Sequence, residues 1–589
     1  MAELIAGIDL GTTNSEISFF IDGKIVLIPI DGDPVMPSCV GIDPSGKMIV
    51  GRSAKNQMVS YPESTVVSIK RKMGNDVHVT LGDKSFSPEE VSAIILRQLK
   101  NKAEEYLKQP VKKAVITVPA FFQDHQRQAT LEAGKLAGLD VVRIINEPTA
   151  ASVAYEADHS GNQNILVYDL GGGTFDVSLV SVENGIVEVK SSHGDTLLGG
   201  DDFDNLIIEH LLKHIKESHS TDLSSDKKIR QRLWKAAEKA KRDLSDHPFT
   251  KIREEYITDS IHLDIEISRE EYESMIMPLL QKTLDCIHAC LGDVGKVSGD
   301  IDRVLLVGGS TRTPLVHTLI ERMLNKTPQG EINPDLIVSM GAAAHGAVIG
   351  GVTTHSILVD ITPFSFGTSA VDFEDDRPNY DKFVPVIKRN TPLPASKTEA
   401  FCTVLDGQES VEVNIYQGES ASASANTFIG KFLIQGLSDI PAPNVILLNL
   451  ELDLNGMLKV TATEKSTGLS KTVMMDTKKP QASNNTNASE NLFTGLPEME
   501  GIDFDSGTES TDEDFISSDN SSDGNDLLIQ AKSLRKRAEK LLGSNINKED
   551  AEELKDLLEK SREAVASGET GLLSDYNASL EDLVFYLED

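Results

Sequence analysis

The stretch Ile5-Ala-Gly-Ile-Asp-Leu-Gly-Thr-Thr-Asn14 decides the fold, because it returns about 160 residues later as Ile165-Leu-Val-Tyr-Asp-Leu-Gly-Gly-Gly-Thr-Phe-Asp176. Each copy is an apolar run that ends in aspartate and is followed by a turn rich in glycine and threonine. A second apolar run follows each turn, over residues 17–21 and 177–182. The repeat therefore predicts two similar α/β lobes, each presenting a strand–turn–strand hairpin to a shared ligand.

The two turns have the composition of a phosphate-binding site. Glycine has no Cβ to keep backbone N–H groups away from phosphate oxygens, and Thr12, Thr13 and Thr174 add hydroxyl donors. Asp9 and Asp169 stand where the strands end, which suits them to hold hydrated Mg²⁺. One such turn is weak support, since tight hairpins look alike, but two copies in the same context favour phosphate binding. The expected contacts are Asp9, Gly11, Thr12, Thr13, Asn14, Gly171, Gly172, Gly173 and Thr174.

A second glycine-rich stretch, Gly41-Ile-Asp-Pro-Ser-Gly-Lys47, nearly fits a P-loop. Met48 stands where a P-loop has the Ser or Thr that meets Mg²⁺, and the residues after it look like a strand rather than a helix. We therefore interpret this stretch as a hairpin turn.

A helix predicted over residues 229–245 carries two distinct faces. Apolar residues share one face, and the spacing i, i+3, i+4, i+7 puts Glu238, Lys241, Arg242 and Ser245 on another. Such a face is usually solvated, but beside a phosphate site it can also form one wall of a nucleoside pocket. Val304-Leu-Leu-Val-Gly-Gly-Ser-Thr-Arg312 reads as a buried strand that ends in a Gly-Gly turn, shaped to lie under a base and sugar.

Composition excludes several classes of function. A formal net charge of −35 over 589 residues argues against binding to nucleic acid or to anionic membranes. Four cysteines in so long a chain do not form a disulfide framework, which favours a reducing compartment. Because no apolar run is long enough to span a membrane and no signal peptide opens the chain, we expect a cytoplasmic protein.

The pattern along the chain predicts five parts. Apolar runs alternate with helical patterns over residues 1–352, which indicates an α/β domain. A short linker, 353–362, leads to alternating strands with turn signals over 363–477, a β-sandwich. Residues 478–525 are acidic and rich in Ser, Asn and Gly, and we expect them to be disordered. Residues 526–589 have the apolar spacing of a short helical segment.

A series of motifs resembles the signature of the 70-kDa heat-shock (DnaK-type) chaperone family. It comprises Asp9-Leu-Gly-Thr-Thr13, Val118-Pro-Ala-Phe-Phe122, Asn146-Glu-Pro-Thr-Ala-Ala151, Asp169-Leu-Gly-Gly-Gly-Thr-Phe-Asp176, Gly194-Asp-Thr-Leu-Leu-Gly-Gly200 and Val307-Gly-Gly-Ser-Thr-Arg312, in the family's order. The match continues through Arg389-Asn-Thr-Pro-Leu-Pro394 and Val413-Asn-Ile-Tyr-Gln-Gly-Glu419. The chain is most similar to the shortened, specialised bacterial paralogues of that family (HscC-like).

The resemblance implies an actin-like, two-lobed ATPase that hydrolyses ATP slowly. It places Lys70 at the γ-phosphate, although by itself Lys70 looks like part of a surface basic run. Catalytic roles carry over to Lys70, Glu147, Asp169, Thr174 and Asp176, and Mg²⁺ would lie near Asp9 and Asp169, with K⁺ as a further candidate cation. Adenosine of ATP or ADP would meet Glu238, Lys241, Arg242, Ser245, Gly308, Gly309, Ser310, Arg312 and Asp335.

The resemblance also implies coupling between the two large domains. Pro119 and Arg127 match the family's proline switch and relay arginine. Ile357, Leu358, Val359 and Asp360 match its interdomain linker, although Ser356 replaces the first apolar residue. Arg143, Asn146 and Asp360 match positions that meet the J-domain of a co-chaperone.

By the same resemblance, the sandwich would grip an extended apolar segment of an unfolded client. Phe401, Val404, Val411 and Val413 match the lining of its side-chain pocket, and Val371 and Val404 match the pair that arches over the peptide. Each of these residues could equally be ordinary sandwich core.

Two departures from the family pattern have functional implications. The segment between Gly74 and Ser87 is shorter than in housekeeping members, which leaves the nucleotide-exchange factor uncertain. The chain after Val473 lacks the long lid helix, which predicts fast peptide exchange.

Three alternatives stay open to different degrees. Sugar kinases and actin-like filament proteins share the ATPase fold but lack the linker and sandwich. A holdase or regulatory relative with little hydrolysis is a stronger rival, although Lys70, Glu147 and Thr174 are all present. A chaperone dedicated to a single client is the third alternative.

Overall fold

The computed structural model describes residues 3–158, 161–328, 333–352, 357–374 and 377–475, together with 554, 555, 557, 558 and 560. The expected acidic segment 478–525 and nearly all of the expected helical segment 526–589 lie outside these residues, as does Ser356. In the tail, Leu554 and Leu558 are one helical turn apart and both buried. Within the described part of the chain, no helix has the length and apolar character to span a membrane.

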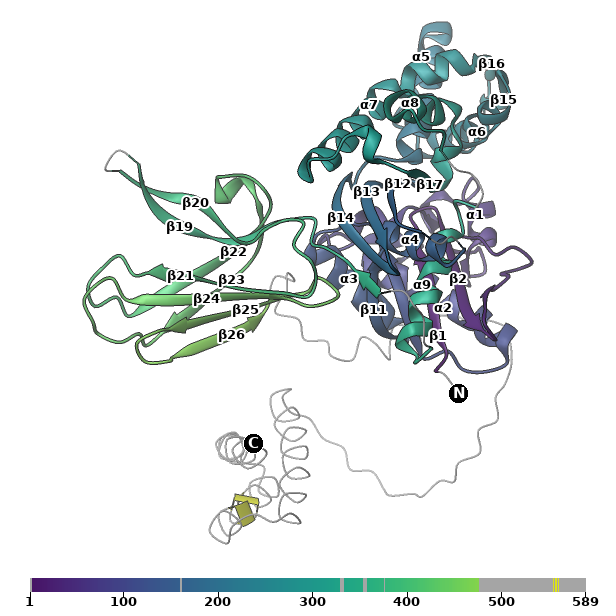
Figure 1. Ribbon diagram of the computed structural model, residues 1–589. Coiled ribbons are helices and arrows are strands. Elements are labelled where there is room, and N and C mark those ends of the chain that lie inside the picture. The colour runs from purple at the N-terminus through teal and green to yellow at the C-terminus, as the bar shows by residue number, and fades with distance from the viewer. Residues whose placement is uncertain are drawn as a thin grey trace. The chain divides into compact units, whose positions relative to one another are not determined.

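The first copy of the repeat forms the centre of a mixed sheet with strand order β11-β10-β1-β2-β3 (Figure 1). Parallel pairing joins β1 to β10, and antiparallel pairing joins β1 to β2 with Asp9 opposite Glu16. The strands are β1 (Ile5–Leu10), β2 (Asn14–Ile21), β3 (Lys24–Leu27), β10 (Lys113–Val118) and β11 (Asp140–Asn146), with β4 (Met36–Pro37) paired to β2.

The second copy forms a sheet of matching design, with order β17-β12-β13-β14-β18. Here β12 pairs in parallel with β17 and antiparallel with β13, so that Asp169 lies opposite Asp176. The strands are β12 (Gln163–Leu170), β13 (Phe175–Glu183), β14 (Ile186–Asp195), β17 (Arg303–Val307) and β18 (Ile357–Val359). The agreement in order and direction confirms the two-lobed fold that the repeat predicts.

Helices cover both faces of the first sheet. On one face α2 (Pro88–Leu107) and α3 (Asp124–Leu136) bury apolar side chains against β1 and β2. On the other, α9 (Ile337–Ile349) packs on β1 and β2 and on α4 (Glu147–Asp158). Contact there is close: a Cβ on Gly7 would lie 2.1 Å from the backbone nitrogen of Ala343. The helix α2 begins with Ser87 and Glu90 in a reciprocal capping box and Pro88 in its first turn.

A smaller part of the first lobe lies between β4 and α2. It contains β5 (Val40–Ile42), β6 (Met48–Val50), α1 (Arg52–Gln57), η1 (Pro62–Ser64), β7 (Thr65–Val66), η2 (Ile69–Lys72), β8 (Val79–Leu81) and β9 (Lys84–Phe86). The P-loop-like stretch is the turn between antiparallel β5 and β6, where the Asp43 carboxylate accepts from the backbone N–H of Ser45 and Lys47. Our interpretation of this stretch as a hairpin turn is therefore confirmed.

The second lobe carries its own helical layer around one apolar core. That layer comprises α5 (Gly200–His219), α6 (Lys227–Asp246), the hairpin β15 (Phe249–Thr258) and β16 (Ile261–Ser268), α7 (Arg269–Asp293), η3 (Ser298–Asp300), η4 (Gly309–Arg312) and α8 (Pro314–Leu324). The helix α6 buries Ile229, Leu233, Ala237, Ala240 and Leu244, which confirms the predicted apolar face.

After β18 the chain forms two four-stranded antiparallel sheets that enclose a separate apolar core. One sheet has order β20-β19-β22-β23, from β19 (Phe366–Glu374), β20 (Arg377–Ile387), β22 (Ser410–Gln417) and β23 (Thr427–Gln435). The other has order β21-β24-β25-β26, from β21 (Ala395–Cys402), β24 (Val445–Leu452), β25 (Leu458–Glu464) and β26 (Ser470–Met474). A short turn, η5 (Ala423–Ala425), follows β22. Ile415, Leu450 and Val460 are fully buried between the sheets, which accounts for the alternating strand pattern.

Candidate functional site

A cleft of about 800 Å³ lies where the two repeated turns meet. The turns touch closely, because a Cβ on Gly172 would lie 1.8 Å from Thr13 Oγ1 and one on Gly173 would lie 2.6 Å from Thr12 Cγ2. The Thr13 hydroxyl is buried and has no hydrogen-bond partner among the described residues. Side chains at positions 172 and 173 would fill the space between the turns. That space, with an unpaired hydroxyl beside it, fits a phosphate group.

Most of the predicted nucleotide contacts line this cleft. It brings together Asp9, Gly11, Thr12, Thr13, Asn14, Lys70, Glu147, Asp169, Gly171, Gly172, Thr174, Glu238, Lys241, Arg242, Ser245, Gly308, Gly309, Ser310, Arg312 and Asp335. Two predicted residues, Gly173 and Asp176, lie just behind the lining. The carbonyl of Gly173 accepts from Arg71 Nε at 3.1 Å, and Asp176 accepts from the backbone N–H groups of Ala120 and Phe121 at 3.2 and 3.1 Å.

Lys70 lies buried in the cleft rather than on the surface that its basic neighbours suggest. Its Nζ donates to Glu147 Oε1 at 2.5 Å, and Nζ lies 5.7 Å from the centre of the Phe122 ring. Burial alone would lower the pKa of Lys70, but the carboxylates of Glu147 and Asp9 outweigh it and raise that pKa. Lys70 is therefore a permanently charged donor at the phosphate end of the cleft.

The carboxylates around Lys70 need more positive charge than one lysine supplies. Burial, and then the charge of Glu147, raises the pKa of Asp9 to about 7 and raises that of Asp169 well above its usual range. No group of three or more His, Cys, Asp and Glu side chains within the described ranges is arranged to hold a metal by itself. Oxygen ligands of this kind fit Mg²⁺ that keeps most of its water, which Asp9 and Asp169 could hold.

The charged face of α6 points into the cleft. Lys241 Nζ pairs with Asp204 Oδ1 at 2.8 Å and donates to the carbonyl of Gly200 at 3.0 Å, at the start of α5. Glu238 accepts from Arg242 at 2.9 Å and from Lys55, across the cleft, at 2.8 Å. Glu238 and Lys241 are mostly buried, whereas 67% of the Arg242 side chain is exposed, so this face is solvated in part and its contact with a nucleoside stays a prediction.

The strand β17 ends in the Gly-Gly turn that the sequence predicts. Ser310 Oγ donates to the carbonyl of Gly171 at 2.8 Å, which ties this turn to the second phosphate-type turn. Arg312 Nη2 pairs with Asp335 Oδ2 at 2.7 Å. A Cβ on Gly309 would lie 3.2 Å from Asp335 Oδ1, so the glycine leaves room beside this pair.

The lining also contains residues that sequence reasoning missed: Glu16, Asp201, Asp204, Trp234, Asp246, Val307, Thr313, His317, Pro334 and Val338. Trp234 could have been found, because it precedes Glu238 by one helical turn on α6. Lys55 Nζ lies 5.6 Å from the centre of its ring. Burial, followed by the charges of Asp9 and Asp335, raises the pKa of Glu16 well above its usual range.

The predicted coupling residues meet beside the cleft. Arg127 is buried and donates to Asn146 Oδ1 at 2.7 Å, to the carbonyl of Ala120 at 3.1 Å and to that of Phe122 at 3.2 Å. Asn146 Nδ2 in turn donates to both carboxylate oxygens of Asp360, at 2.9 and 3.0 Å. These contacts join the loop that contains Pro119, the edge strand β11 and the linker.

The linker is part of the second lobe's sheet. Ile357, Leu358 and Val359 pair in parallel with residues 186–188 at the edge of β14. Burial lowers the pKa of Arg143, which lies on β11. The charge of the neighbouring Asp360 acts in the opposite direction and favours the charged arginine. The sandwich therefore joins the second lobe through a hydrogen-bonded strand.

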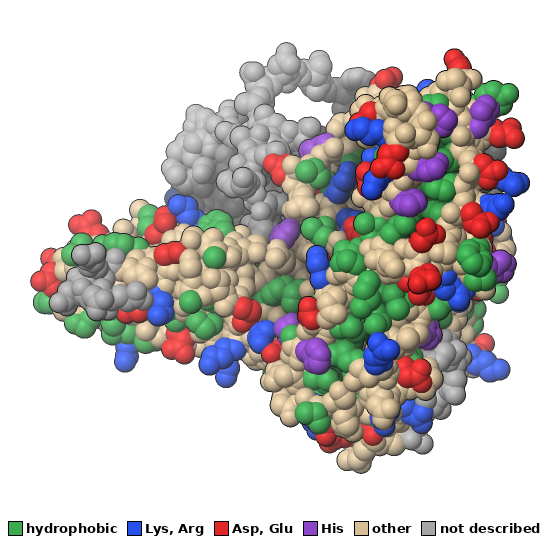
Figure 2. Space-filling model, turned by 90° about the horizontal axis from the view of Figure 1, so that it is seen from above, with side chains coloured by type: hydrophobic (Ala, Val, Ile, Leu, Met, Phe, Trp, Pro, Cys, Tyr) green, Lys and Arg blue, Asp and Glu red, His purple; other side chains and the backbone are tan. Residues whose placement is uncertain are grey.

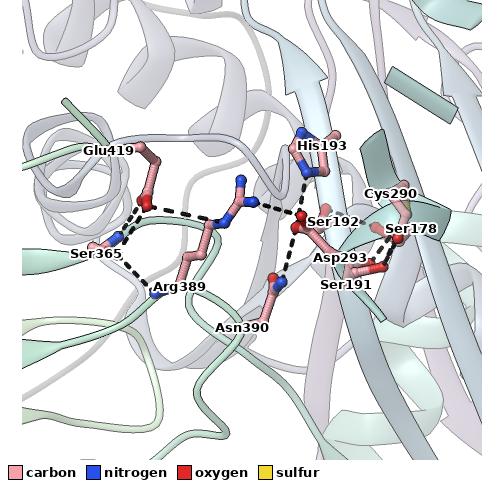
Figure 3. Close-up of polar contacts among 10 residues, drawn as sticks. All are labelled: Ser178, Ser191, Ser192, His193, Cys290, Asp293, Ser365, Arg389, Asn390 and Glu419. Atoms are coloured by element: carbon pink, nitrogen blue, oxygen red, sulfur yellow. Dashed lines mark hydrogen bonds and ion pairs between the residues drawn. The ribbon is translucent and has the colours of Figure 1, made fainter. Parts of the chain in front are cut away.

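Side chains of the sandwich also contact the α/β domain directly (Figure 3). Arg389 Nη2 donates to Asp293 Oδ1 at 2.5 Å, and Asn390 Nδ2 donates to Asp293 Oδ2 at 3.0 Å. His193, on β14, reaches the same Oδ2 at 3.0 Å. Asp293, at the end of α7, is thus shared between its own lobe and the sandwich.

The five predicted peptide contacts differ in exposure. Val413 is buried in the sandwich core, and Phe401 and Val411 are half-buried at its border. Val404 is 52% exposed, and Val371 is half-buried on β19. Their role in binding a peptide stays a prediction.

Fold and cleft together define a class: a two-lobed nucleotide-binding protein whose second lobe is joined by a strand to a β-sandwich. The family model described as Hsp70 protein matches residues 5–587, nearly the whole chain. The chain therefore belongs to the Hsp70 family, a family of ATP-dependent chaperones that bind ATP or ADP with Mg²⁺.

Proposed function

We propose that this chain hydrolyses ATP in the cleft and that the bound nucleotide controls the affinity of the sandwich for extended apolar segments of unfolded proteins. The observation that carries the proposal is the linker strand β18, which pairs with the same sheet that presents the second turn to the cleft. A change at the phosphate end can therefore reach the sandwich through one continuous set of hydrogen bonds.

The residues at the phosphate end supply the chemistry that phosphoryl transfer needs, which is mainly positioning and charge neutralisation. Lys70 holds a positive charge at a position fixed by Glu147, where it can meet the γ-phosphate. Thr13 and the two glycine turns offer hydroxyl and backbone N–H donors. Glu147, with Thr174 across the cleft, is suited to order the attacking water. When bound, Mg²⁺ neutralises phosphate charge beside Asp9 and Asp169.

The base and sugar would lie between α6 and the turn after β17. Glu238, Lys241 and Arg242 offer charged and polar groups on one side, and Ser310 and Arg312 on the other. We assign adenosine to these residues because the two glycine turns and Lys70 already account for the phosphates.

Coupling would run from Asp176 to the sandwich. Asp176 accepts from the N–H groups of Ala120 and Phe121, the Ala120 carbonyl accepts from Arg127, and Asn146 links Arg127 to Asp360. Pro119, next to Ala120, would hold this loop in one of two positions. A J-domain co-chaperone acting near Arg143, Asn146 and Asp360 would then bias the same relay.

Peptide binding is assigned to the sandwich. Its border carries apolar side chains that are not fully buried, among them Phe401, Val404 and Val411. An unfolded client is a more suitable ligand than nucleic acid: on the face seen in Figure 2, Lys and Arg are interspersed with Asp and Glu instead of forming a basic surface.

The test is single-turnover ATP hydrolysis by the wild-type protein and by Lys70→Ala, with and without an unfolded apolar peptide. We expect slow turnover by the wild type, acceleration by the peptide, and a loss of about 100-fold or more in the variant. ATP binding should persist in Lys70→Ala, which shows that the variant folds. If the wild type binds ATP but does not turn it over even with peptide, the protein is a nucleotide-gated holdase and the hydrolysis proposal fails.

A further inference from the structure

Lys70 lies on a short turn, η2, whose residues on either side of the lysine bind the other lobe. Ser68 immediately precedes η2, and Arg71 follows Lys70 within it. Ser68 Oγ donates to Asp201 Oδ2 at 2.6 Å, and Arg71 Nη2 pairs with Asp202 Oδ2 at 2.7 Å. Both carboxylates belong to the first turn of α5, in the second lobe. Two bonds that flank Lys70 therefore join the first lobe to the second.

The same residues are bonded to the second glycine turn of the cleft. The backbone N–H of Asp201 donates to the carbonyl of Gly172 at 2.7 Å. Arg71 Nε donates to the carbonyl of Gly173 at 3.1 Å. These bonds fix η2 relative to a turn that we expect to hold phosphate. The position of Lys70 beside that turn is thus set by the bonds between the lobes as well as by the lysine's own ion pair.

The backbone of Ser68 has a conformation that favours glycine. Its φ of 52° lies in the left-handed region, where a Cβ is crowded against the backbone. A serine at the start of a helical turn commonly accepts a hydrogen bond from an N–H group of that turn. Within the part of the chain that the structure describes, the Ser68 hydroxyl makes no such bond to η2 and donates to Asp201 instead. The strained residue therefore directs its hydroxyl to the other lobe.

We propose that Ser68 is a positioning residue for ATP hydrolysis: its bond to Asp201 holds η2 against the second lobe and keeps Lys70 at the γ-phosphate. The inference rests on the proposed function, because it assumes that Lys70 meets that phosphate. The bond from Lys70 to Glu147 orients the end of the lysine side chain, whereas the Ser68 bond fixes the backbone from which that side chain starts. Loss of the Ser68 hydroxyl should therefore slow the chemical step and leave ADP binding intact, because ADP has no γ-phosphate.

The test is single-turnover ATP hydrolysis by the full-length wild type, Ser68→Ala and Ser68→Gly, with the dissociation constants for ATP and ADP measured on the same samples. We expect both variants to hydrolyse bound ATP roughly 10-fold more slowly than the wild type. Their affinity for ADP should change by less than about 2-fold, which also shows that they fold. Alanine keeps a side chain on the strained backbone and glycine relieves the strain, so similar losses in the two variants assign the effect to the hydroxyl.

Ser220→Gly is the matched control. Ser220 also has a left-handed backbone, with a φ of 53°, but it is exposed at the opposite end of α5 from Asp201. Relief of the same strain should make Ser220→Gly at least as stable in urea as the wild type, because glycine suits this position after a helix. Its rate of ATP hydrolysis should equal that of the wild type.

Wild-type hydrolysis rates in both Ser68 variants would overturn the proposal. A loss in Ser68→Gly alone would overturn it as well, because the cause would then be the looser backbone. If the wild type itself does not turn over ATP, the hydrolysis proposal fails, and the ratio of ATP affinity to ADP affinity decides the role of Ser68. A ratio that is lower in Ser68→Ala than in the wild type supports that role, and an equal ratio contradicts it.

Discussion

The two lobes share a backbone plan but not an electrostatic plan. The first hairpin places Asp9 opposite Glu16, and the second places Asp169 opposite Asp176, in the same antiparallel register. Backbone amides of the loop at Ala120 and Phe121 donate to Asp176, whereas the side chain of the buried Glu16 has no hydrogen-bond partner among the described residues. The difference shows how a duplicated element can divide its roles: the second hairpin is hydrogen-bonded to the loop before α3, and the matching carboxyl group of the first hairpin makes no such bond.

The largest expected difference between the lobes is in how much a substitution behind each hairpin lowers the free energy of unfolding. Gly7 in β1 occupies the repeat position that Val167 holds in β12, and a Cβ on Gly7 would lie 2.1 Å from the backbone of Ala343. Gly7→Ala should therefore lower the free energy of unfolding by about 3 kcal/mol or more, because two backbones must separate. Urea denaturation of the nucleotide-free protein measures this change in the free energy of unfolding.

Val167→Ala is the matched change in the second lobe. It leaves a small cavity and should cost about 2 kcal/mol, less than the added methyl costs at Gly7. Equal or reversed costs would show that α9 does not press on β1 as closely as the structure indicates.

The carboxylates themselves should respond oppositely to neutralisation. Asp176 accepts a backbone N–H group on each of its two oxygens, and the amide of Asp176→Asn can accept on only one atom, so this change should lower the free energy of unfolding by about 1–3 kcal/mol. Glu16→Gln replaces a buried carboxyl group that has no hydrogen-bond partner among the described residues, and it should leave that free energy unchanged or raise it. Denaturation in chelator-treated buffer makes the comparison, and a larger loss for Glu16→Gln would contradict it.

A smaller loss of folding stability should appear at acid pH because of His345. This residue lies on α9, which packs against the first lobe's sheet. Burial, followed by the charge of Arg143, lowers the pKa of His345 from 6.5 to about 4. Because the folded pKa lies below the unfolded one, the stability that neutral His345 permits is present above pH 6.5 and is lost as pH falls toward 4.

The loss should reach about 1–2 kcal/mol at pH 5. His345→Asn should flatten this part of the pH profile of stability, measured by denaturation between pH 7 and 4.5. A variant with the slope of the wild type would show that other groups control acid destabilisation.

The sequence predicts the hairpins and the cleft well because their signals are local. The repeat gives the central hairpin of each sheet, and helical spacing gives the buried face of α6 and a separate polar face. What it misses depends on long-range pairing. Glu16 looks like any strand residue until its pairing with Asp9 and its place in the cleft are known. The sequence around Asp293 likewise gives no sign that Arg389 and Asn390 bind it.

Other expectations stay predictions. The likeness to the shortened bacterial paralogues, the domain boundaries and the exchange factor are not tested by the fold. The peptide contacts show why: Val413 is a core residue and Val404 is exposed, and either environment suits a strand of an ordinary sandwich.

The central claim is that nucleotide in the cleft controls the sandwich through the docked linker. The most direct measurement is the rate at which a fluorescent, unfolded apolar peptide dissociates from the full-length protein in ATP and in ADP, for the wild type and for Asp360→Ala. We predict that dissociation from the wild type is at least about 10-fold faster in ATP than in ADP, and that Asp360→Ala removes most of this difference while still binding both nucleotides. Equal dissociation rates in ATP and ADP for the wild type would contradict the account.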